Sequence, residues 1–368
     1  MIVGTRPEAI KMAPVIRALQ QSRSLEPITV CTSQHRHMVH QIFRSFGIRN
    51  YHDLQVMRKS QTLWDLSGRL ATKLGRFFLQ FPADAVLVQG DTSSAFFGGL
   101  CAYYHKIPVG HVEAGLRTGN KYFPFPEEMN RTLLGAVATW HFAPTAAAAR
   151  QLTKEGIPRK SIHVTGNTVV DALRWMAPRC SELPLKRLLG RENFARKLLL
   201  VTCHRRESLG APMRNIASAL AEVGQNGTHD VAILFPLHPN PAVRACVKPA
   251  LERLPNVVLC EPLDYEHFLA ALKHAHVVIS DSGGVQEEAT ALGKPVLVLR
   301  KETERQEGVR AGALKLVGTD RGRIVRETLR LLEDPRAYKR MATGSTVFGD
   351  GNAAKRIVRV LERSPRGV

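Results

Sequence analysis

Short runs of β-branched and aliphatic residues alternate with longer amphipathic stretches, and this alternation constrains the fold more than any other feature. Four runs in the first half have the composition of strands: residues 28–31, 85–88, 108–112 and 162–164. Four stretches have helical periodicity: residues 7–19, 61–79, 95–104 and 145–155. Strands that are joined by helices of this length form parallel βαβ units, so the pattern predicts a doubly wound α/β sheet.

The alternation pauses over residues 178–196, which contain no clear strand, and then begins again. The second series of strands comprises residues 197–202, 231–235, 257–260, 277–280 and 295–299. A chain of 368 residues is long enough for two hydrophobic cores. We therefore predict two Rossmann-like domains, residues 1–170 and 171–348. The final helix, in residues 349–368, follows a glycine-rich break and is a candidate to cross back to the first domain.

Composition narrows the function classes. The formal net charge is +20, an excess typical of proteins that bind nucleic acid, anionic membranes or phosphorylated ligands. The basic residues are scattered and only 6% of residues are aromatic, which argues against nucleic acid. The sequence contains no apolar run of about 18 residues, so no membrane span is predicted. The first residues lack a signal-peptide pattern and the six cysteines form no CxxC pair, which favours reduced thiols in the cytoplasm.

The carboxyl ends of parallel strands are where open α/β sheets bind ligands, so the residues that follow each strand are the candidates for a site. Gly4 permits a tight turn after the first strand, and Thr5 can cap the next helix. Arg6 and Lys11 beside the N-terminus of this helix could hold a phosphate. The alternative is an ordinary capped helix with surface charges, since the segment contains neither a Walker A motif nor GxGxxG.

Three carboxylates and an arginine follow later strands of the first half. Asp91 comes directly after residues 85–88, although an N-cap is the better interpretation of this residue alone. Glu113 and Arg117 lie on a glycine-containing loop and are poor core residues, so we expect both to face the ligand crevice. Glu127 follows two prolines at the start of a helix, where an acidic residue also complements the helix dipole.

Basic and small residues follow the strands of the second half. His204, next to Arg205, is a candidate phosphate ligand or acid–base group. Neighbouring cations favour the neutral form of this histidine unless a phosphate or a carboxylate offsets them. His238 follows another strand, where a histidine that only makes local hydrogen bonds is an equal alternative.

A Ser-Gly-Gly segment opens a later helix. Ser282, Gly283 and Gly284 can present a hydroxyl group and backbone N–H groups to an anion. Glu288 lies about one turn into this helix, within reach of a ribose. Carboxylates in the first half and anion-binding groups in the second half fit a ligand with a sugar at one end and a nucleoside diphosphate at the other.

Five segments in matching order resemble the non-hydrolysing UDP-N-acetylglucosamine 2-epimerases. They are GTRPEAIKMAP (residues 4–14), GHVEAGLRTG (110–119), PEE (126–128), HRRES (204–208) and DSGGVQEE (281–288). The likeness extends from Gly4 to about Gly351, which is nearly the whole chain.

The resemblance implies a GT-B-like architecture, usually a homodimer, with the active site in the cleft between the two domains. It implies reversible conversion of UDP-N-acetylglucosamine to UDP-N-acetylmannosamine, a precursor of cell-surface polysaccharide. In this family UDP leaves by anti elimination after abstraction of the C2 proton, and it then adds back to a 2-acetamidoglucal intermediate. Neither a metal nor a redox cofactor is needed.

The family's functional residues carry over position by position. Asp91, Glu113 and Glu127 match carboxylates near C2 and the sugar, and His204 matches a histidine by the diphosphate. The positions that match contacts to UDP or to the ligand are Arg6, Lys11, His238, Ser282, Gly283, Gly284 and Glu288. The candidates for the cleft or for a second, allosteric nucleotide-sugar site are Gln34, His35, Arg117, Arg205 and Arg305.

Some positions depart from the family pattern. His37 and Ser60 differ in the two regions that form the allosteric site of bacterial members, which speaks against allosteric control in this chain. Cys203 replaces a small residue, and Gln306 stands where proline is usual. The first strand, residues 1–3, is shorter than in the family.

Two other enzymes and one binding protein are the alternatives. A GT-B glycosyltransferase shares the fold and the UDP-sugar site but needs an acceptor. An epimerase that acts on a modified UDP-N-acetylhexosamine would carry the same motifs. The hypothesis of a non-catalytic nucleic-acid binder is supported by the net charge alone. It predicts that the protein binds DNA or RNA with an affinity that falls steeply as the salt concentration rises.

Overall fold

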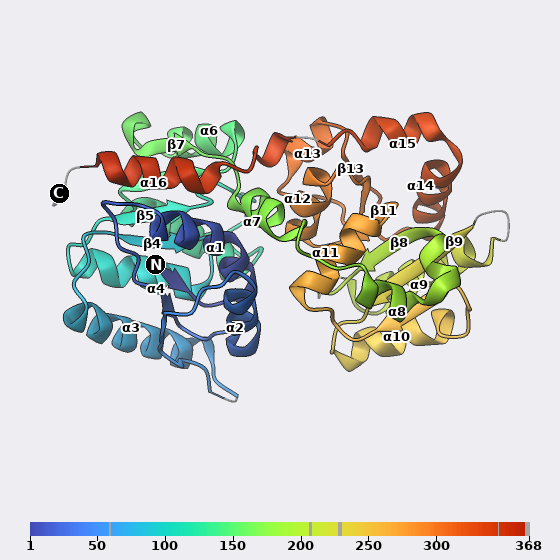
Figure 1. Ribbon diagram of the computed structural model, residues 1–368, viewed down its shortest axis with the longest axis horizontal. Coiled ribbons are helices and arrows are strands. Elements are labelled where there is room, and N and C mark those ends of the chain that lie inside the picture. The colour runs from blue at the N-terminus through green and yellow to red at the C-terminus, as the bar shows by residue number, and fades with distance from the viewer. Residues whose placement is uncertain (59, 206–207, 227–229, 345, 365–368) are drawn as a thin grey trace. The chain divides into compact units, whose positions relative to one another are not determined.

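The computed structural model describes residues 1–58, 60–205, 208–226, 230–344 and 346–364, and it contains two compact units. The first unit comprises Met1–Trp175 and Phe348–Val368, and the second comprises Met176–Val347 (Figure 1). Both units are built on parallel sheets with helical crossovers, which confirms the predicted α/β class. None of the helices in these described ranges combines the length and the apolar character that a bilayer span requires.

The first unit contains two parallel sheets in the orders β1-β2-β3 and β4-β5-β6-β7, and β1 contacts β4. Its strands are β1 (Ile2–Val3), β2 (Val30–Cys31), β3 (His52–Asp53), β4 (Val86–Gln89), β5 (Val109–Val112), β6 (Trp140–Ala143) and β7 (Ile162–Val164). Its helices are α1 (Arg6–Gln20), α2 (Arg36–Ser45), α3 (Leu63–Gln80), α4 (Ser93–Tyr104), α5 (Glu127–Val137), α6 (Ala146–Lys154), α7 (Thr168–Met176) and α16 (Ala353–Arg363). The candidate residues of this unit follow β1, β2, β4 and β5.

The second unit has one parallel sheet in the order β10-β9-β8-β11-β12-β13. Its strands are β8 (Lys197–Thr202), β9 (Val231–Pro236), β10 (Val257–Cys260), β11 (Val277–Ser280), β12 (Val296–Val298) and β13 (Leu314–Leu316). Its helices are α8 (Leu183–Ala195), α9 (Ala211–Gln225), α10 (Pro241–Leu251), α11 (Tyr265–His274), α12 (Gly283–Ala291), α13 (Gln306–Arg310), α14 (Arg321–Glu333) and α15 (Pro335–Met341). This is the Rossmann order, in which β8 and β11 flank the switch point where ligands bind.

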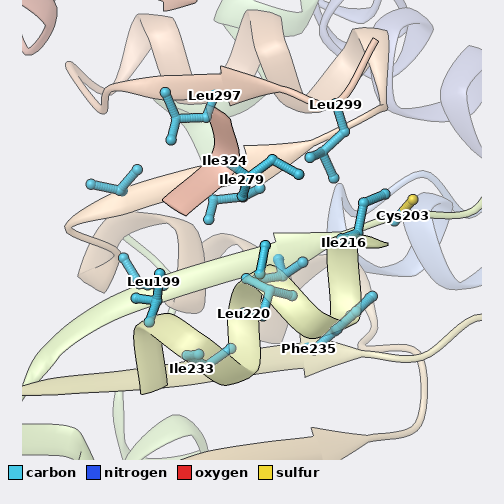
Figure 2. Close-up of a cluster of buried hydrophobic side chains, with 14 of the residues drawn as sticks. Leu199, Cys203, Ile216, Leu220, Ile233, Phe235, Ile279, Leu297, Leu299 and Ile324 are labelled. Atoms are coloured by element: carbon cyan, nitrogen blue, oxygen red, sulfur yellow. The ribbon is translucent and has the colours of Figure 1, made fainter. Parts of the chain in front are cut away.

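The core of the second unit explains why β8 is apolar from Leu198 to Val201. Leu199 lies in a cluster with Leu220 of α9 and Ile324 of α14 on one face of the sheet (Figure 2). Leu198 and Leu200, which point to the opposite face, are equally buried. A strand that is covered on both faces loses the alternation of polar and apolar residues, which is why its sequence is a continuous apolar run.

The C-terminal helix α16 packs against α1 in the first unit, and Figure 1 shows it in red among the blue and green elements. The Asp171 carboxylate of α7 accepts hydrogen bonds from the backbone N–H groups of Ala353 (3.2 Å) and Ala354 (2.9 Å), the first two residues of α16. Gly349 has a φ of 130° and approaches Gly166 so closely that a Cβ would lie 3.2 Å from the Gly166 Cα. The glycine-rich break therefore allows the chain to return to the first unit.

Candidate functional site

Asp91 and Glu113 follow β4 and β5, and the side chain of Arg131 from α5 joins them. Its Nη2 atom lies 2.6 Å from Asp91 Oδ2 and 3.5 Å from Glu113 Oε1. The neighbouring Asn130 side chain donates a hydrogen bond to the Asp91 carbonyl at 2.9 Å. Both carboxylates lie at the strand ends where the sequence predicts them, whereas Arg131, which is buried despite its charge, was not predicted.

Glu113 is held by three further features. Its φ of 66° places a non-glycine residue in the left-handed region, a conformation that concentrates at functional sites. Lys11 of α1 forms a buried ion pair with its carboxylate, and Asn167 donates a hydrogen bond at 3.1 Å. Lys11 pairs with Glu113 in this structure, and its contact with UDP stays a prediction. With Arg131, two cations face the carboxylates of Asp91 and Glu113, and these ion pairs fix the side chains in position.

Two buried side chains position the loops around Asp91. The neutral His111 ring donates from Nε2 to the Gly90 carbonyl at 2.7 Å, and burial lowers the pKa of this histidine to about 3. Glu8 accepts hydrogen bonds from the Gly4 and Thr5 backbone N–H groups at 3.1 and 2.7 Å, and from the Thr92 hydroxyl at 2.7 Å. Burial raises the pKa of Glu8 to about 7. Glu8 therefore links the turn after β1 to the loop after β4.

The turn after β1 is closely packed. A Cβ at Gly4 would lie 2.1 Å from the Ser94 Oγ atom, so only glycine fits here. Ser94 also donates a hydrogen bond to Gln34 at 3.0 Å, and the His35 backbone N–H donates to the Gly4 carbonyl at 2.8 Å. Arg6 is half-buried at the start of α1 and forms no ion pair within the described residues. The structure thus brings Gln34 and His35, the second-site candidates, to the same turn as Arg6.

Glu127 and Glu128 open α5 in different environments. Glu127 is half-buried, whereas Glu128 is buried and accepts hydrogen bonds from the Thr118 and Gly119 backbone N–H groups, each at 3.0 Å. Glu128 therefore fixes the loop after β5, a role that its place in the motif did not reveal. Arg117 of this loop forms an ion pair with Glu155 at 2.8 Å.

In the second unit, Asp281 organises the switch point from the end of β11. It is fully buried, and its Oδ2 atom accepts hydrogen bonds from the Cys203 thiol (3.2 Å) and from the backbone N–H groups of His204 and Arg205 (both 2.9 Å). Its Oδ1 atom lies 3.3 Å from His204 Nδ1. The carboxylate therefore holds the segment after β8 against β11, a role that its place in the DSGGVQEE segment did not indicate.

The imidazole rings of His204 and His238 stack, with centroids 6.1 Å apart and planes inclined by 16°. The His238 Nδ1 atom accepts a hydrogen bond from the Asn240 backbone N–H at 3.2 Å. Arg205 donates from Nε to the Asp281 carbonyl at 3.1 Å. Arg206 and Glu207 of the same motif lie outside the described residues. The structure thus brings the two predicted histidines together at the carboxyl ends of β8 and β9.

Ser282 is the N-cap of α12, and its side chain makes no capping hydrogen bond within the helix. Its backbone N–H donates to the Ser280 hydroxyl at 3.0 Å. Later in α12, buried Glu288 accepts a hydrogen bond from the Tyr265 hydroxyl at 3.0 Å. The helix N-terminus lies at the switch point and is suited to an anion.

Arg305, a candidate for the cleft or a second site, lies in a buried ion-pair network beside α12. Its Nε and Nη2 atoms are each 2.9 Å from Glu287 Oε1, and its Nη1 atom is 3.4 Å from Glu304. Glu304 also pairs with Arg300 at 2.9 Å. Because Arg305 packs against the backbone of Gly283, a Cβ at that glycine would lie 2.8 Å from the guanidinium carbon.

We expect Gly283→Ala to destabilise the protein by about 1–3 kcal/mol, because the added methyl group displaces the Arg305 guanidinium from Glu287. Gly284→Ala is the matched control, since a Cβ there meets no atom within 4 Å. We expect that variant to be as stable as the wild type or slightly more stable. Urea denaturation of both variants measures the difference, and equal stabilities would contradict the packing argument.

Glu304 predicts a pH dependence of stability. Burial opposes ionisation of this carboxyl, but the hydrogen bonds and charges of Arg300 and Arg305 outweigh it and lower its pKa to about 2. Its folded-state pKa is below the unfolded value, so its contribution is present above about pH 4.5 and is lost as the pH falls towards 2. The pKa shift corresponds to a contribution of about 3 kcal/mol at most to the free energy of unfolding. We expect Glu304→Gln to remove this acid-sensitive part of the urea-denaturation profile, while exposed Glu252→Gln leaves it unchanged.

Comparisons with known proteins match nearly the whole chain to one family. A family model for UDP-N-acetylglucosamine 2-epimerase matches residues 17–362. The chain is 44% identical over 366 residues to the UDP-N-acetylglucosamine 2-epimerase of Yersinia pestis, and the match covers 98% of this chain and 97% of that protein. It is 46% identical over 361 residues to the enzyme of the same name from Bacillus subtilis, with 98% and 93% covered.

Solved structures show the same similarity. The crystal structure of UDP-GlcNAc 2-epimerase from Neisseria meningitidis bound to UDP-GlcNAc superimposes with a TM-score of 0.92 at 42% identity, and covers 98% of both chains. The enzyme from Methanocaldococcus jannaschii, in complex with UDP-GlcNAc and UDP, gives a TM-score of 0.82 at 33% identity, with 98% of both chains covered. This chain therefore belongs to the UDP-N-acetylglucosamine 2-epimerase family of isomerases.

Proposed function

We propose that the protein converts UDP-N-acetylglucosamine reversibly to UDP-N-acetylmannosamine without net hydrolysis. The observation that carries this proposal is the pair of carboxylates Asp91 and Glu113, which Arg131 holds together at neighbouring strand ends. Inversion at C2 requires a proton to leave one face of the sugar and another to arrive on the opposite face. Two fixed carboxylates can provide the base and the acid, and exchange these roles in the reverse direction.

The C2–H bond next to an acetamide is a weak acid, so a positioned base is required. We propose that one carboxylate of the first unit, from Asp91, Glu113 and Glu127, abstracts this proton while UDP leaves from the opposite face. The product is a 2-acetamidoglucal. Reprotonation on the other face and re-addition of UDP then complete the epimerisation.

The leaving diphosphate accumulates negative charge, and the second unit provides groups suited to it. We propose that His204 and the N-terminus of α12 at Ser282 bind the diphosphate, because both lie at the β8–β11 switch point. Glu288 is the proposed ribose contact. We further propose that Arg6, at the N-terminus of α1, contributes a positive charge to the same ligand.

The decisive experiment incubates the protein with UDP-N-acetylglucosamine in deuterated water and follows the sugar by proton NMR. We expect UDP-N-acetylmannosamine to appear, with deuterium at C2 of both epimers. Absence of both results would overturn the proposal. Release of free N-acetylmannosamine would indicate a hydrolysing epimerase, and a product that forms only with an added acceptor would indicate a glycosyltransferase.

We propose that the epimer serves cytoplasmic synthesis of a polysaccharide precursor, and that the protein is a homodimer, as its family resemblance implies. Exposed apolar side chains at the C-terminal ends of α3 and α4 support self-association, since Leu79 is 74% exposed and Tyr104 is 72% exposed, and Phe78 and His105 join these two ends. Sedimentation velocity tests the dimer. A monomer at micromolar concentration would contradict this part of the proposal.

A further inference from the structure

Three side chains with different metal-ligating atoms converge in the first unit, on strands β2 and β3 and helix α2. Cys31 of β2 and Asp53 of β3 are register partners on neighbouring parallel strands, which directs both side chains to the same face. His40 of α2 covers that face. The Cys31 Sγ atom, a ring nitrogen of His40 and a carboxylate oxygen of Asp53 all lie within 4.8 Å of one another.

The hydrogen bonding around this cluster leaves a ligand position open. The His40 Nε2 atom is buried and makes no hydrogen bond within the described residues, although it lies 3.3 Å from Asp53 Oδ2. The ring nitrogen therefore faces a carboxylate oxygen without a well-aligned hydrogen bond, and a metal ion held by both atoms would satisfy them. Cys31 is also fully buried, and its thiol lies 3.4 Å from the Ser33 hydroxyl, a weak contact that a metal–sulfur bond could replace.

Hydrogen bonds orient the Asp53 carboxylate as the supporting residues of a metal site would. Its Oδ1 atom accepts from the Ser33 hydroxyl at 2.5 Å and from the Gln55 backbone N–H at 3.0 Å. The Oδ2 atom is the one directed at His40. Arg36 Nε lies 3.5 Å from Oδ2, but the Arg36 side chain is 54% exposed, so its charge can move into solvent when a cation binds.

We propose that Cys31, His40 and Asp53 bind one Zn²⁺ ion, with water completing a tetrahedron. Sulfur, imidazole nitrogen and carboxylate oxygen form a donor set that zinc accepts and that magnesium and calcium do not favour. Metal–ligand bonds of about 2.0–2.3 Å place ligand atoms roughly 3.5 Å apart, so a small closure of the cluster is sufficient. The thiol proton passes to solvent as the Cys31–zinc bond forms.

A bound ion would join α2 to the central strand β2 and the edge strand β3 of this sheet. It would thereby anchor both ends of residues 32–35, the segment that places Gln34 and His35 beside the turn after β1. We therefore expect the metal to stabilise the first unit. This inference is independent of the proposed epimerase activity, because metal binding is measured without a nucleotide sugar.

The test titrates metal-free protein with Co²⁺, a spectroscopic substitute for Zn²⁺. We expect one equivalent to produce thiolate-to-cobalt charge-transfer absorption, which Zn²⁺ abolishes and Mg²⁺ does not. Cys31→Ser should eliminate this band, and His40→Gln and Asp53→Asn should each weaken Co²⁺ binding at least about tenfold. Cys246→Ser is the matched control, since Cys246 is a free, partly buried thiol of the second unit, and it should keep the band.

Two further measurements keep the result unambiguous. Far-UV circular dichroism establishes that each variant is folded before titration. Zn²⁺ should raise the Tm of the wild type and of Cys246→Ser, but not that of Cys31→Ser. No charge-transfer band in the folded wild type, or a band that persists in Cys31→Ser, would overturn the proposal.

Discussion

Asp91→Asn is expected to lower kcat for epimerisation by about 10²–10⁴-fold, the range that a positioned acid–base group contributes. An amide at this position has nearly the same shape but cannot accept the C2 proton. Arg131 still has Glu113 as a partner, so we expect the variant to remain folded. Initial rates of UDP-N-acetylmannosamine formation measure the loss, and exchange of the C2 proton in deuterated water shows whether abstraction itself has failed.

The control for Asp91 is Asp230→Asn, which makes the same chemical change at an exposed ion pair with Arg196 in the second unit. We expect this variant to retain the wild-type rate. If Asp91→Asn loses less than about tenfold in kcat, the acid–base role passes to Glu113 or Glu127. If exchange persists while the epimer is not formed, Asp91 acts after proton abstraction.

Asp281→Ala is expected to destabilise the second unit by about 3–5 kcal/mol, since it combines lost hydrogen bonds with a cavity. The substitution leaves the backbone N–H groups of His204 and Arg205 without their shared acceptor, and the cavity opens beside the Cys203 thiol. Because this carboxylate is fully buried, water cannot easily replace it. Thermal unfolding should show a decrease in Tm of roughly 10 °C.

Asp230→Ala provides the matched comparison for stability, because the Asp230 side chain is 76% exposed. Exposed ion pairs contribute little to stability, so we expect the Tm of Asp230→Ala to lie close to that of the wild type. Measuring the affinity for UDP distinguishes a local role of Asp281 at the switch point from a role in the stability of the whole unit. If Asp281 positions the switch point, the variant should bind UDP more weakly even at temperatures where it is fully folded. Unchanged stability and unchanged UDP affinity would contradict both expectations.

The sequence predicted the doubly wound class and the strand-end positions of Asp91, Glu113 and His204, because both follow from local periodicity. It did not predict Arg131 or Asn167, because each reaches Glu113 from a segment distant in sequence. Such convergence depends on how the helices pack and has no local pattern. The burial of Lys11 had a weak signal, since a cation within the largely apolar residues 9–16 requires a buried countercharge.

The strand β6 was missed for a related reason. Its sequence, Trp-His-Phe-Ala, contains neither Val nor Ile, the residues that mark the predicted strands, including the two that also contain a histidine. His141 is nevertheless buried, and burial is the main reason why its pKa falls to about 4, so the neutral ring is tolerated in the core. The sequence places the end of the first domain at residue 170, and the structure places it at Trp175. The sequence places the end of the second domain at residue 348, and the structure places it at Val347.

The return of α16 to the first unit has a consequence for the order of folding during synthesis. The second unit, Met176–Val347, is continuous in the chain and can form as soon as it leaves the ribosome. The first unit begins earlier but lacks α16, the partner of α1, until the last part of the chain has been made. The half of the protein that is synthesised first is therefore completed last.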